Sequence, residues 1–155
     1  MLKNIMLKEI IQQAIVEDIG TGDITTESIV SNGVNTIGFM HAKEDGVVAG
    51  LFVAEAVFRN LNHDISFQPR AKDGESIQAG QLLARVEGDA RAILIGERIA
   101  LNFLQRMSGI ATKTAYLVSL IQGEKAKLVD TRKTTPGLRV LDKYAVRAGG
   151  GYRCV

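Results

Sequence analysis

The chain has 155 residues and a mass of 16.8 kDa, enough for one ordinary domain or for one small domain and part of another. Apolar residues make up 46% and charged residues 23%, a balance typical of globular proteins with a buried core, so intrinsic disorder is excluded. Cys154 is the single cysteine, which excludes a disulfide scaffold and a zinc finger. Neither a bilayer-spanning run nor a signal peptide is recognised, so we expect a cytoplasmic protein without a membrane partner.

Positive charge is concentrated near the carboxyl end of the sequence. The net charge of +2 is too small to imply nucleic acid as a partner. Residues 130–155 hold six Lys or Arg against two Asp, a net charge of +4, which leaves −2 on the preceding 129 residues. This asymmetry favours a local anion site over a generally basic surface.

The first part of the sequence predicts helices and short strands. Apolar residues at helical spacing predict amphipathic helices over 5–18 and 51–61. Short apolar runs bounded by turn residues predict strands over 36–42, 47–48, 65–69 and 82–86. Turns are expected at 20–23, 44–46, 73–74 and 79–80. We therefore expect an α+β domain with an antiparallel sheet.

Residues 74–83 support a rival hypothesis, because they resemble half of the hammerhead found in biotinyl and lipoyl carrier domains. Such carriers need a lysine at the tip of a hairpin. The nearest candidates, Lys43 and Lys72, lie in neither the expected hairpin nor the expected spacing. A non-catalytic interaction or carrier module nevertheless stays as an alternative function.

The longest helix is predicted over 90–107 and is apolar nearly all round, so we expect it to be buried. An unpaired buried charge is costly, which makes its polar residues informative. Arg98, Asn102 and Gln105 share one face at helical spacing. Arg98 either forms an internal ion pair with a carboxylate or points at an anion at a subunit boundary.

A second region of the chain is expected to begin near residues 105–112. The predicted helix breaks at 108–112, continues to 122, and is followed by a parallel strand over 126–130. Helix followed by strand indicates α/β organisation. We therefore divide the chain into an α+β domain, residues 1–107, and the start of a second domain, residues 108–155.

The residues that follow the predicted strand point to anion chemistry. Loops at the carboxyl ends of such strands converge on one crevice. Arg132 offers a planar fork suited to carboxylate or phosphate, Lys133 adds a compact charge, and Thr131, Thr134 and Thr135 add hydroxyls. A solvated basic loop is the alternative, but the coincidence favours a polyanion site. After a predicted helix over 138–148, Gly149 to Gly151 fit either an anion-binding nest or an ordinary helix cap.

Several stretches, in order along nearly the whole chain, resemble the amino-terminal half of the quinolinate phosphoribosyltransferases, also called nicotinate-nucleotide pyrophosphorylases (carboxylating). They are EDIGTGDITT at 17–26, GVVAGL at 46–51, ERIALNFL at 97–104, SGIAT at 108–112, DTRKTTPGLR at 130–139 and KYAV at 143–146. As a set these motifs are highly specific. A molybdate-transport-linked phosphoribosyltransferase homologue shares many of them and is the nearest alternative.

The resemblance implies a fold and a reaction. The fold is an α+β sandwich followed by an incomplete α/β barrel, in a dimer whose sites use both subunits. The reaction joins quinolinate and phosphoribosyl pyrophosphate, with Mg²⁺, to give nicotinate mononucleotide, pyrophosphate and carbon dioxide. Arg98 matches the arginine that reaches into the partner's site. Thr131, Arg132 and Lys133 match the substrate loop, and Arg132 and Lys133 are our catalytic candidates.

The last residues, 152–155, depart from the family pattern, which continues with Asn-His-Arg after one variable residue. We expect that the barrel is truncated, that the Mg²⁺ ligands are absent from this chain and that the chain alone is inactive. Apolar surface on the 126–130 strand and the 138–148 helix also predicts association into dimers or larger species.

Overall fold

A small antiparallel sheet forms the base of the molecule. The computed structural model describes residues 2–20 and 30–154, without the side chains of residues 2–5. Strand β5 (Leu82–Asp89) lies in the centre of the sheet, between β1 (Asn35–His41) and β3 (Ser66–Pro69), and is antiparallel to both. Strands β2 (Gly46–Val47) and β4 (Ser76–Ile77) make a separate antiparallel pair. The expected sheet is confirmed, and only β4 was not predicted.

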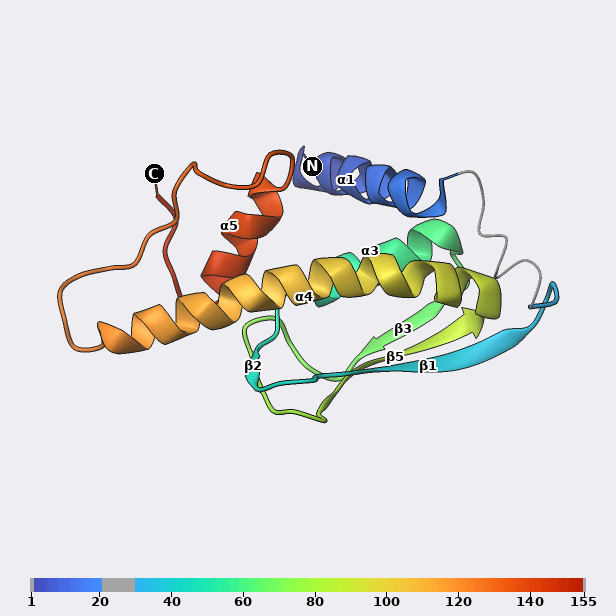
Figure 1. The fold of residues 1–155 in the computed structure, drawn as a ribbon, viewed down its shortest axis with the longest axis horizontal. Helices are drawn as coiled ribbons and strands as arrows, with labels where there is room; N and C mark the ends of the chain where they lie inside the picture. Colours follow the sequence, from blue (N-terminus) through green and yellow to red (C-terminus); the bar gives the residue numbers. More distant parts are fainter. Residues whose placement is uncertain (1, 21–29, 155) are drawn as a thin grey trace.

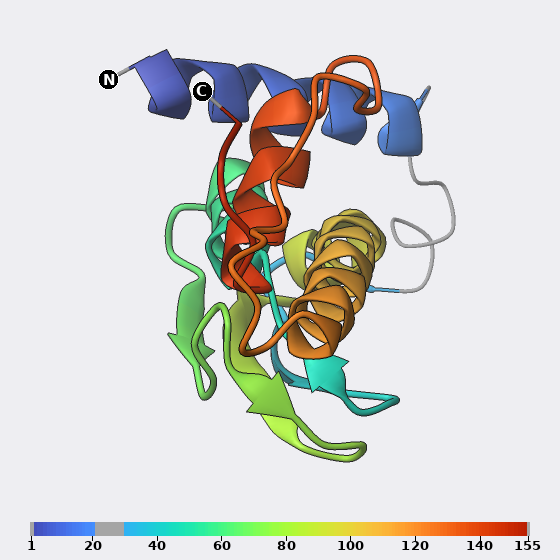
Figure 2. The ribbon, with the colours of Figure 1, turned by 90° about the vertical axis from the view of Figure 1, so that its left-hand side faces the viewer.

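The helices in the described part of the chain lie on one side of this sheet (Figures 1 and 2). Helices α3 (Leu51–Leu61) and α4 (Ala90–Leu120) pack against each other and on the sheet, and α1 (Leu2–Ile19) crosses over both. Helix α5 (Arg139–Ala148) packs against α4. In the described part of the chain no helix combines the length and the apolar character needed to cross a membrane. Residues 21–23 of the predicted first turn lie outside the described residues.

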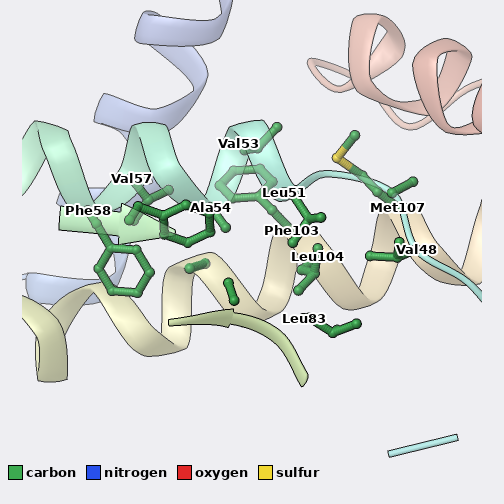
Figure 3. Packing of buried hydrophobic residues seen from close by; sticks show 14 of the residues in the cluster. Val48, Leu51, Val53, Ala54, Val57, Phe58, Leu83, Phe103, Leu104 and Met107 are labelled. Carbon is green, nitrogen blue, oxygen red and sulfur yellow. The ribbon is translucent and has the colours of Figure 1, made fainter. Parts of the chain in front are cut away.

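The core lies between the helices and the sheet. Side chains from α3, α4 and β5 meet there, and Val53, Val57 and Met107 have no exposed surface (Figure 3). Alternation along β1 leaves Ile37 and Phe39 exposed on the outer face of the sheet. The sheet is therefore covered on one face only, as is usual for antiparallel sheets.

Helix α4 is continuous, so the predicted break at residues 108–112 is wrong. Met107 and Ala111 are fully buried and continue the apolar face through this segment. The hydroxyls of Ser108 and Thr112 accept hydrogen bonds from the amides of Ala49 and Val47, at 3.0 and 2.9 Å. A single helical glycine costs only about 1 kcal/mol, so these tertiary contacts outweigh the local tendency to break.

The prediction that this helix is buried all round is also wrong. One side of α4 packs on the core, and the opposite side carries exposed charged and polar residues and, toward its end, exposed apolar ones. Arg98 belongs to the exposed side, and its side chain is 53% exposed. Within residues 90–107 the apolar residues include Leu94, which is exposed, so the sequence does not reveal which side of the helix faces the core.

The predicted strand over 126–130 is reduced to an isolated parallel bridge between Val129 and Tyr152. The amides of Asp130 and Tyr152 complete it by donating to the carbonyls of Tyr152 and Leu128. Helix α5 lies between the two bridge partners in the sequence. This order, strand-like segment, helix and parallel strand-like segment, is the unit with which an α/β barrel begins.

The three glycines after α5 form a helix cap rather than an anion-binding nest. Gly150 has a φ of 87°, and its amide donates to the carbonyl of Arg147, while the amide of Gly151 donates to Val146. This is the Schellman arrangement. The amides that a nest would offer to an anion are therefore already used inside the protein.

Candidate functional site

The loop between the Val129 bridge and α5 surrounds a cavity of about 340 Å³. In Figure 1 the chain leaves the end of α4, arches over and enters α5, with this loop at the top of the arch. The cavity lies between the loop, α4 and α5. Its polar lining consists of Arg106, Asp130, Thr131, Lys133, Thr134, Thr135, Asp142 and Lys143.

The base of the loop is held by a buried ion pair. Lys143 Nζ lies 2.6 Å from Asp130 Oδ1, and the amide of Cys154 donates to the same oxygen at 2.8 Å. Burial alone would raise the pKa of Asp130, but these hydrogen bonds and the charges of Lys143 and Arg153 hold the pKa below its ordinary value. Asp130 is therefore an anion, and it partly neutralises the cations around the cavity.

One face of α5 holds the rest of the loop. Arg139, Asp142 and Lys143 share this face because they are three and four residues apart. Arg139 Nε donates to Thr134 Oγ1 at 3.2 Å, and its Nη2 donates to the carbonyl of Arg132 at 3.4 Å. Asp142 Oδ2 accepts from the amide of Thr135 at 3.2 Å. The loop conformation is thus specified by side chains that follow it in the sequence.

The structure places four of the five predicted loop residues in the cavity lining, and Arg132 is the one that does not line it. Thr131 and Lys133 line the cavity, and the Thr131 hydroxyl accepts a hydrogen bond from the Lys133 amide at 3.1 Å. Arg132 is exposed on the same loop. Thr131 and Lys133 therefore lie at one cavity, after a single bridge rather than a full strand, and their role in binding stays a prediction.

Arg98 does not line the loop cavity. Of the two interpretations given for Arg98, the structure shows the ion pair with a carboxylate of the same chain. Its Nη2 and Nε donate to Asp18 Oδ2 at 3.0 and 3.2 Å, which ties α4 to α1. Asp18 also lines a second cavity, of about 570 Å³, between α1, α4 and residues 136–138. Arg98 lines neither this second cavity nor the loop cavity.

Two cations at the loop cavity, Arg106 and Lys143, were missing from the predicted set. Arg106 Nη2 donates to Thr135 Oγ1 at 2.6 Å and to Asp142 Oδ1 at 3.0 Å. A signal was present for Arg106, because it stands eight residues after Arg98 and so on the same side of the helix. Lys143 opens the KYAV motif, but local spacing does not reveal that it reaches Asp130, which is 13 residues earlier in the sequence.

Three further motif residues, Gly50, Leu51 and Tyr144, hydrogen-bond Asp73 and do not line the loop cavity. Asp73 Oδ1 accepts the amides of Gly50 and Leu51 at 3.0 Å and so caps α3, while its Oδ2 accepts the Tyr144 hydroxyl at 2.7 Å. Burial and the neighbouring Asp73 raise the pKa of Tyr144 well above its ordinary value. These contacts join the sheet domain to α5.

The residues in this part of the chain do not fit the Mg²⁺ that the resemblance implies. Residues 2–20 and 30–154 contain no group of three or more His, Cys, Asp or Glu that could hold a metal ion. Asp130 and Asp142 both face the loop cavity, but each already bonds a cation. Asp130 Oδ2 is buried and has no hydrogen-bond partner among the described residues, yet Lys143 on the same carboxylate opposes a cation there.

Comparison with known proteins agrees with this architecture. The chain matches two family models, "Quinolinate phosphoribosyl transferase, N-terminal domain" over residues 23–108 and the corresponding "C-terminal domain" over residues 110–154. A probable nicotinate-nucleotide pyrophosphorylase [carboxylating] of Bacillus subtilis is 43% identical over 151 residues, which are 97% of this chain and 52% of that protein.

Solved structures give the same result. NadC from Streptococcus pyogenes superposes with a TM-score of 0.93 at 40% identity, over 96% of this chain and 53% of that one. The nicotinate-nucleotide pyrophosphorylase from Francisella tularensis gives 0.91 at 38% identity, over 97% and 54%. The chain spans about half the length of the relatives it matches.

Fold and motifs thus define a protein of the phosphoribosyl transferase class, with a sheet-and-helix domain leading into the first unit of an α/β barrel. The chain belongs to the quinolinate phosphoribosyl transferase family. The boundary we predicted between its two domains falls within α4, which is continuous there, and it stays a prediction.

Proposed function

We propose that this chain supplies part of the active site for phosphoribosyl transfer to quinolinate, with release of pyrophosphate and carbon dioxide. The observation that carries the proposal is the cavity at the loop of residues 130–138, where Thr131 and Lys133 lie beside Arg106 and Lys143. The names of the relatives support a phosphoribosyltransferase that acts on quinolinate, rather than the molybdate-transport-linked homologue. The carrier alternative has no support from the turn between β4 and β5, residues 78–81, because it contains no lysine.

The chemistry needs positive charge more than it needs a nucleophile. Quinolinate has two carboxylates and phosphoribosyl pyrophosphate is a polyanion, so the reactants repel each other in water. Fixed cations let both anions approach and hold them in contact. The pyridine nitrogen displaces pyrophosphate from the ribose carbon. Carbon dioxide then leaves the ring, and the electron pair that stays is stabilised by the positive nitrogen and takes a proton.

We assign Arg132 and Lys133 to the binding of the two anionic reactants. The Arg132 fork suits a carboxylate, and the Lys133 ammonium suits the phosphate groups of the donor. Thr131 adds a hydroxyl on the same loop. Mg²⁺ is proposed to accompany the donor, and no step above is assigned to it because this part of the chain offers it no fitting ligands.

Arg98 is proposed to act in a homodimer, in the site of the partner subunit. Within one chain Arg98 lies with Asp18 and α1, while Thr131 and Lys133 line a different cavity. The side chain of Arg98 is 53% exposed, so it is accessible to a second copy. Exposed apolar residues, including Val129 and Tyr152, support association.

Titration of quinolinate into the purified chain, followed by calorimetry, tests the proposal. We expect measurable heat from the wild type and an affinity lower by about tenfold or more in Arg132→Ala and in Lys133→Ala, because each removes a charge-assisted contact. Arg59→Ala is the matched control, since Arg59 is exposed and pairs with Glu55 on α3. Absence of heat with the wild type, or equal losses in the control, would contradict the proposal.

A further inference from the structure

We propose that Arg106 and Asp142 form a clamp that positions the substrate loop, and that Arg106 acts through this loop rather than as a direct ligand of the anion. The purpose of the clamp rests on the proposed function. Its existence can be tested without any ligand. Arg106 is a positioning residue in this assignment, distinct from Arg132 and Lys133.

The hydrogen bonds of Arg106 carry the proposal. Its Nε and Nη2 donate to Asp142 Oδ1 at 3.2 and 3.0 Å, and Nη2 also donates to Asp142 Oδ2 at 3.1 Å. The same Nη2 donates to Thr135 Oγ1 at 2.6 Å. Asp142 in turn accepts from the Thr135 amide at 3.2 Å. Thr135 is therefore held through both its side chain and its backbone.

The loop needs such a restraint. Residues 131–137 form no helix or strand, and most of them are exposed, so little buried apolar surface holds them. Ordering a backbone costs roughly 1–2 kcal/mol per residue. Arg132 and Lys133 also repel each other as neighbours. Asp142 is buried, and its ion pair with Arg106 restrains the far end of the loop, as the ion pair of Asp130 with Lys143 does at the near end.

The clamp also fixes the position of the loop relative to Arg98, because Arg106 and Arg98 lie on the same helix. Both arginines belong to the unbroken helix α4 and stand eight residues apart, which corresponds to about 12 Å along the axis. A rigid helix that grips Thr135 therefore fixes the distance between the loop and the residues around Arg98. The unbroken helix between residues 98 and 106 gives this link its stiffness.

Limited digestion with trypsin tests the clamp, because Arg132 and Lys133 are themselves cleavage sites. Lys127, exposed in the preceding connection, provides an internal reference. We expect the ratio of cleavage after Lys133 to cleavage after Lys127 to rise by about tenfold in Arg106→Met, since the loop then opens more often. Thr135→Val, which keeps the ion pair, should raise the ratio less, and Lys113→Met on the same helix should not change it.

The ratio separates loop opening from general loss of stability, which accelerates both cleavages. A ratio within about twofold of the wild type in both Arg106→Met and Thr135→Val overturns the proposal, whatever happens to total digestion. Arg106→Lys should give an intermediate ratio, because it restores the charge without the fork.

Quinolinate calorimetry adds a second readout. If Arg106 acts through the loop, Arg106→Met and Lys133→Ala should weaken binding less in combination than the product of their separate effects. Strictly multiplicative losses would assign Arg106 to the ligand directly and overturn the positioning role. If the wild type gives no heat, the proposed function fails, while the digestion ratio still decides whether the clamp exists.

Discussion

Single residues around the loop combine burial with charge, and Asp130 is the clearest case. Its side chain lies at the base of the cavity and is bonded by Lys143 and by the amide of Cys154. Only 6% of the residue is exposed. Removing one member of a buried pair leaves the other charge without compensation, which costs more than the pair itself contributes.

We predict that Asp130→Asn lowers the free energy of unfolding by about 3 kcal/mol at pH 7, because Lys143 then keeps a buried charge without a counterion. Urea denaturation followed by circular dichroism measures the change. Asp64→Asn, at an exposed carboxylate, is the control and should alter stability by less than about 0.5 kcal/mol.

The same substitution should also alter the pH dependence of stability. The pKa of Asp130 is lower in the folded protein than its ordinary value, so the unfolded chain binds the proton first as the pH falls. The contribution of Asp130 is therefore complete above its ordinary pKa and is lost as the pH falls through the folded pKa. The difference between wild type and Asp130→Asn should shrink as the pH drops from about 5 toward 2. Parallel curves over this range would contradict the assignment.

At the scale of elements, helix α4 determines how the sheet, α3 and α5 are placed relative to one another. It covers the sheet, carries Arg98 and Arg106, and accepts α5 against its second half. Its two interior glycines differ in surroundings. A Cβ at Gly96 would lie 2.8 Å from a ring carbon of Phe58, whereas a Cβ at Gly109 would meet nothing within 4 Å. Close packing on α3 therefore requires glycine at one position only.

We predict opposite effects for the same substitution at these two positions. Gly109→Ala should raise the free energy of unfolding by about 0.5–1 kcal/mol, because alanine restricts the unfolded chain and favours the helix. Gly96→Ala should lower it by about 1–3 kcal/mol through overpacking against Phe58. Thermal unfolding of the two variants in parallel is the measurement. Destabilisation by Gly109→Ala would indicate that α4 is interrupted near residue 109.

At the scale of the whole molecule, the proposed site depends on two copies of the chain. Within one chain Arg98 pairs with Asp18 and does not line the loop cavity, so each proposed site would combine Arg98 of one subunit with Lys133 of the other. A two-fold symmetric dimer makes two such sites.

Mixing two variants that each bind quinolinate weakly tests this dimer. Arg98→Ala and Arg132→Ala should each bind quinolinate weakly, but after joint refolding about one quarter of the wild-type sites should return. The reason is that half of the dimers are mixed, and each mixed dimer has one site without a substitution. Calorimetric stoichiometry measures the recovery, and light scattering checks that dimers are present. No recovery from a dimeric mixture would exclude action of Arg98 across the interface.

Local pattern predicted most of the elements, and it is also the basis of the proposed anion site. Short apolar runs between turn residues located β1, β3 and β5, and helical spacing located α1 and α3, since burial of one helix face imposes that spacing on the sequence. The polar run at Thr131 to Lys133 indicated an anion site because residue types alone determine charge and hydrogen-bonding capacity. Motif order was enough to indicate the family.

Tertiary contacts decided the rest. Whether α4 breaks at Ser108 depended on hydroxyl bonds to Val47 and Ala49, and the role of the glycines after α5 depended on which carbonyls their amides reached. The partners of Arg98 and Arg106 were decided in the same way. Asp18 lies 80 residues from Arg98, and Asp142 lies 36 residues from Arg106. Local spacing does not reveal which distant carboxylate pairs with an arginine, because the packing of the helices decides which side chains come together.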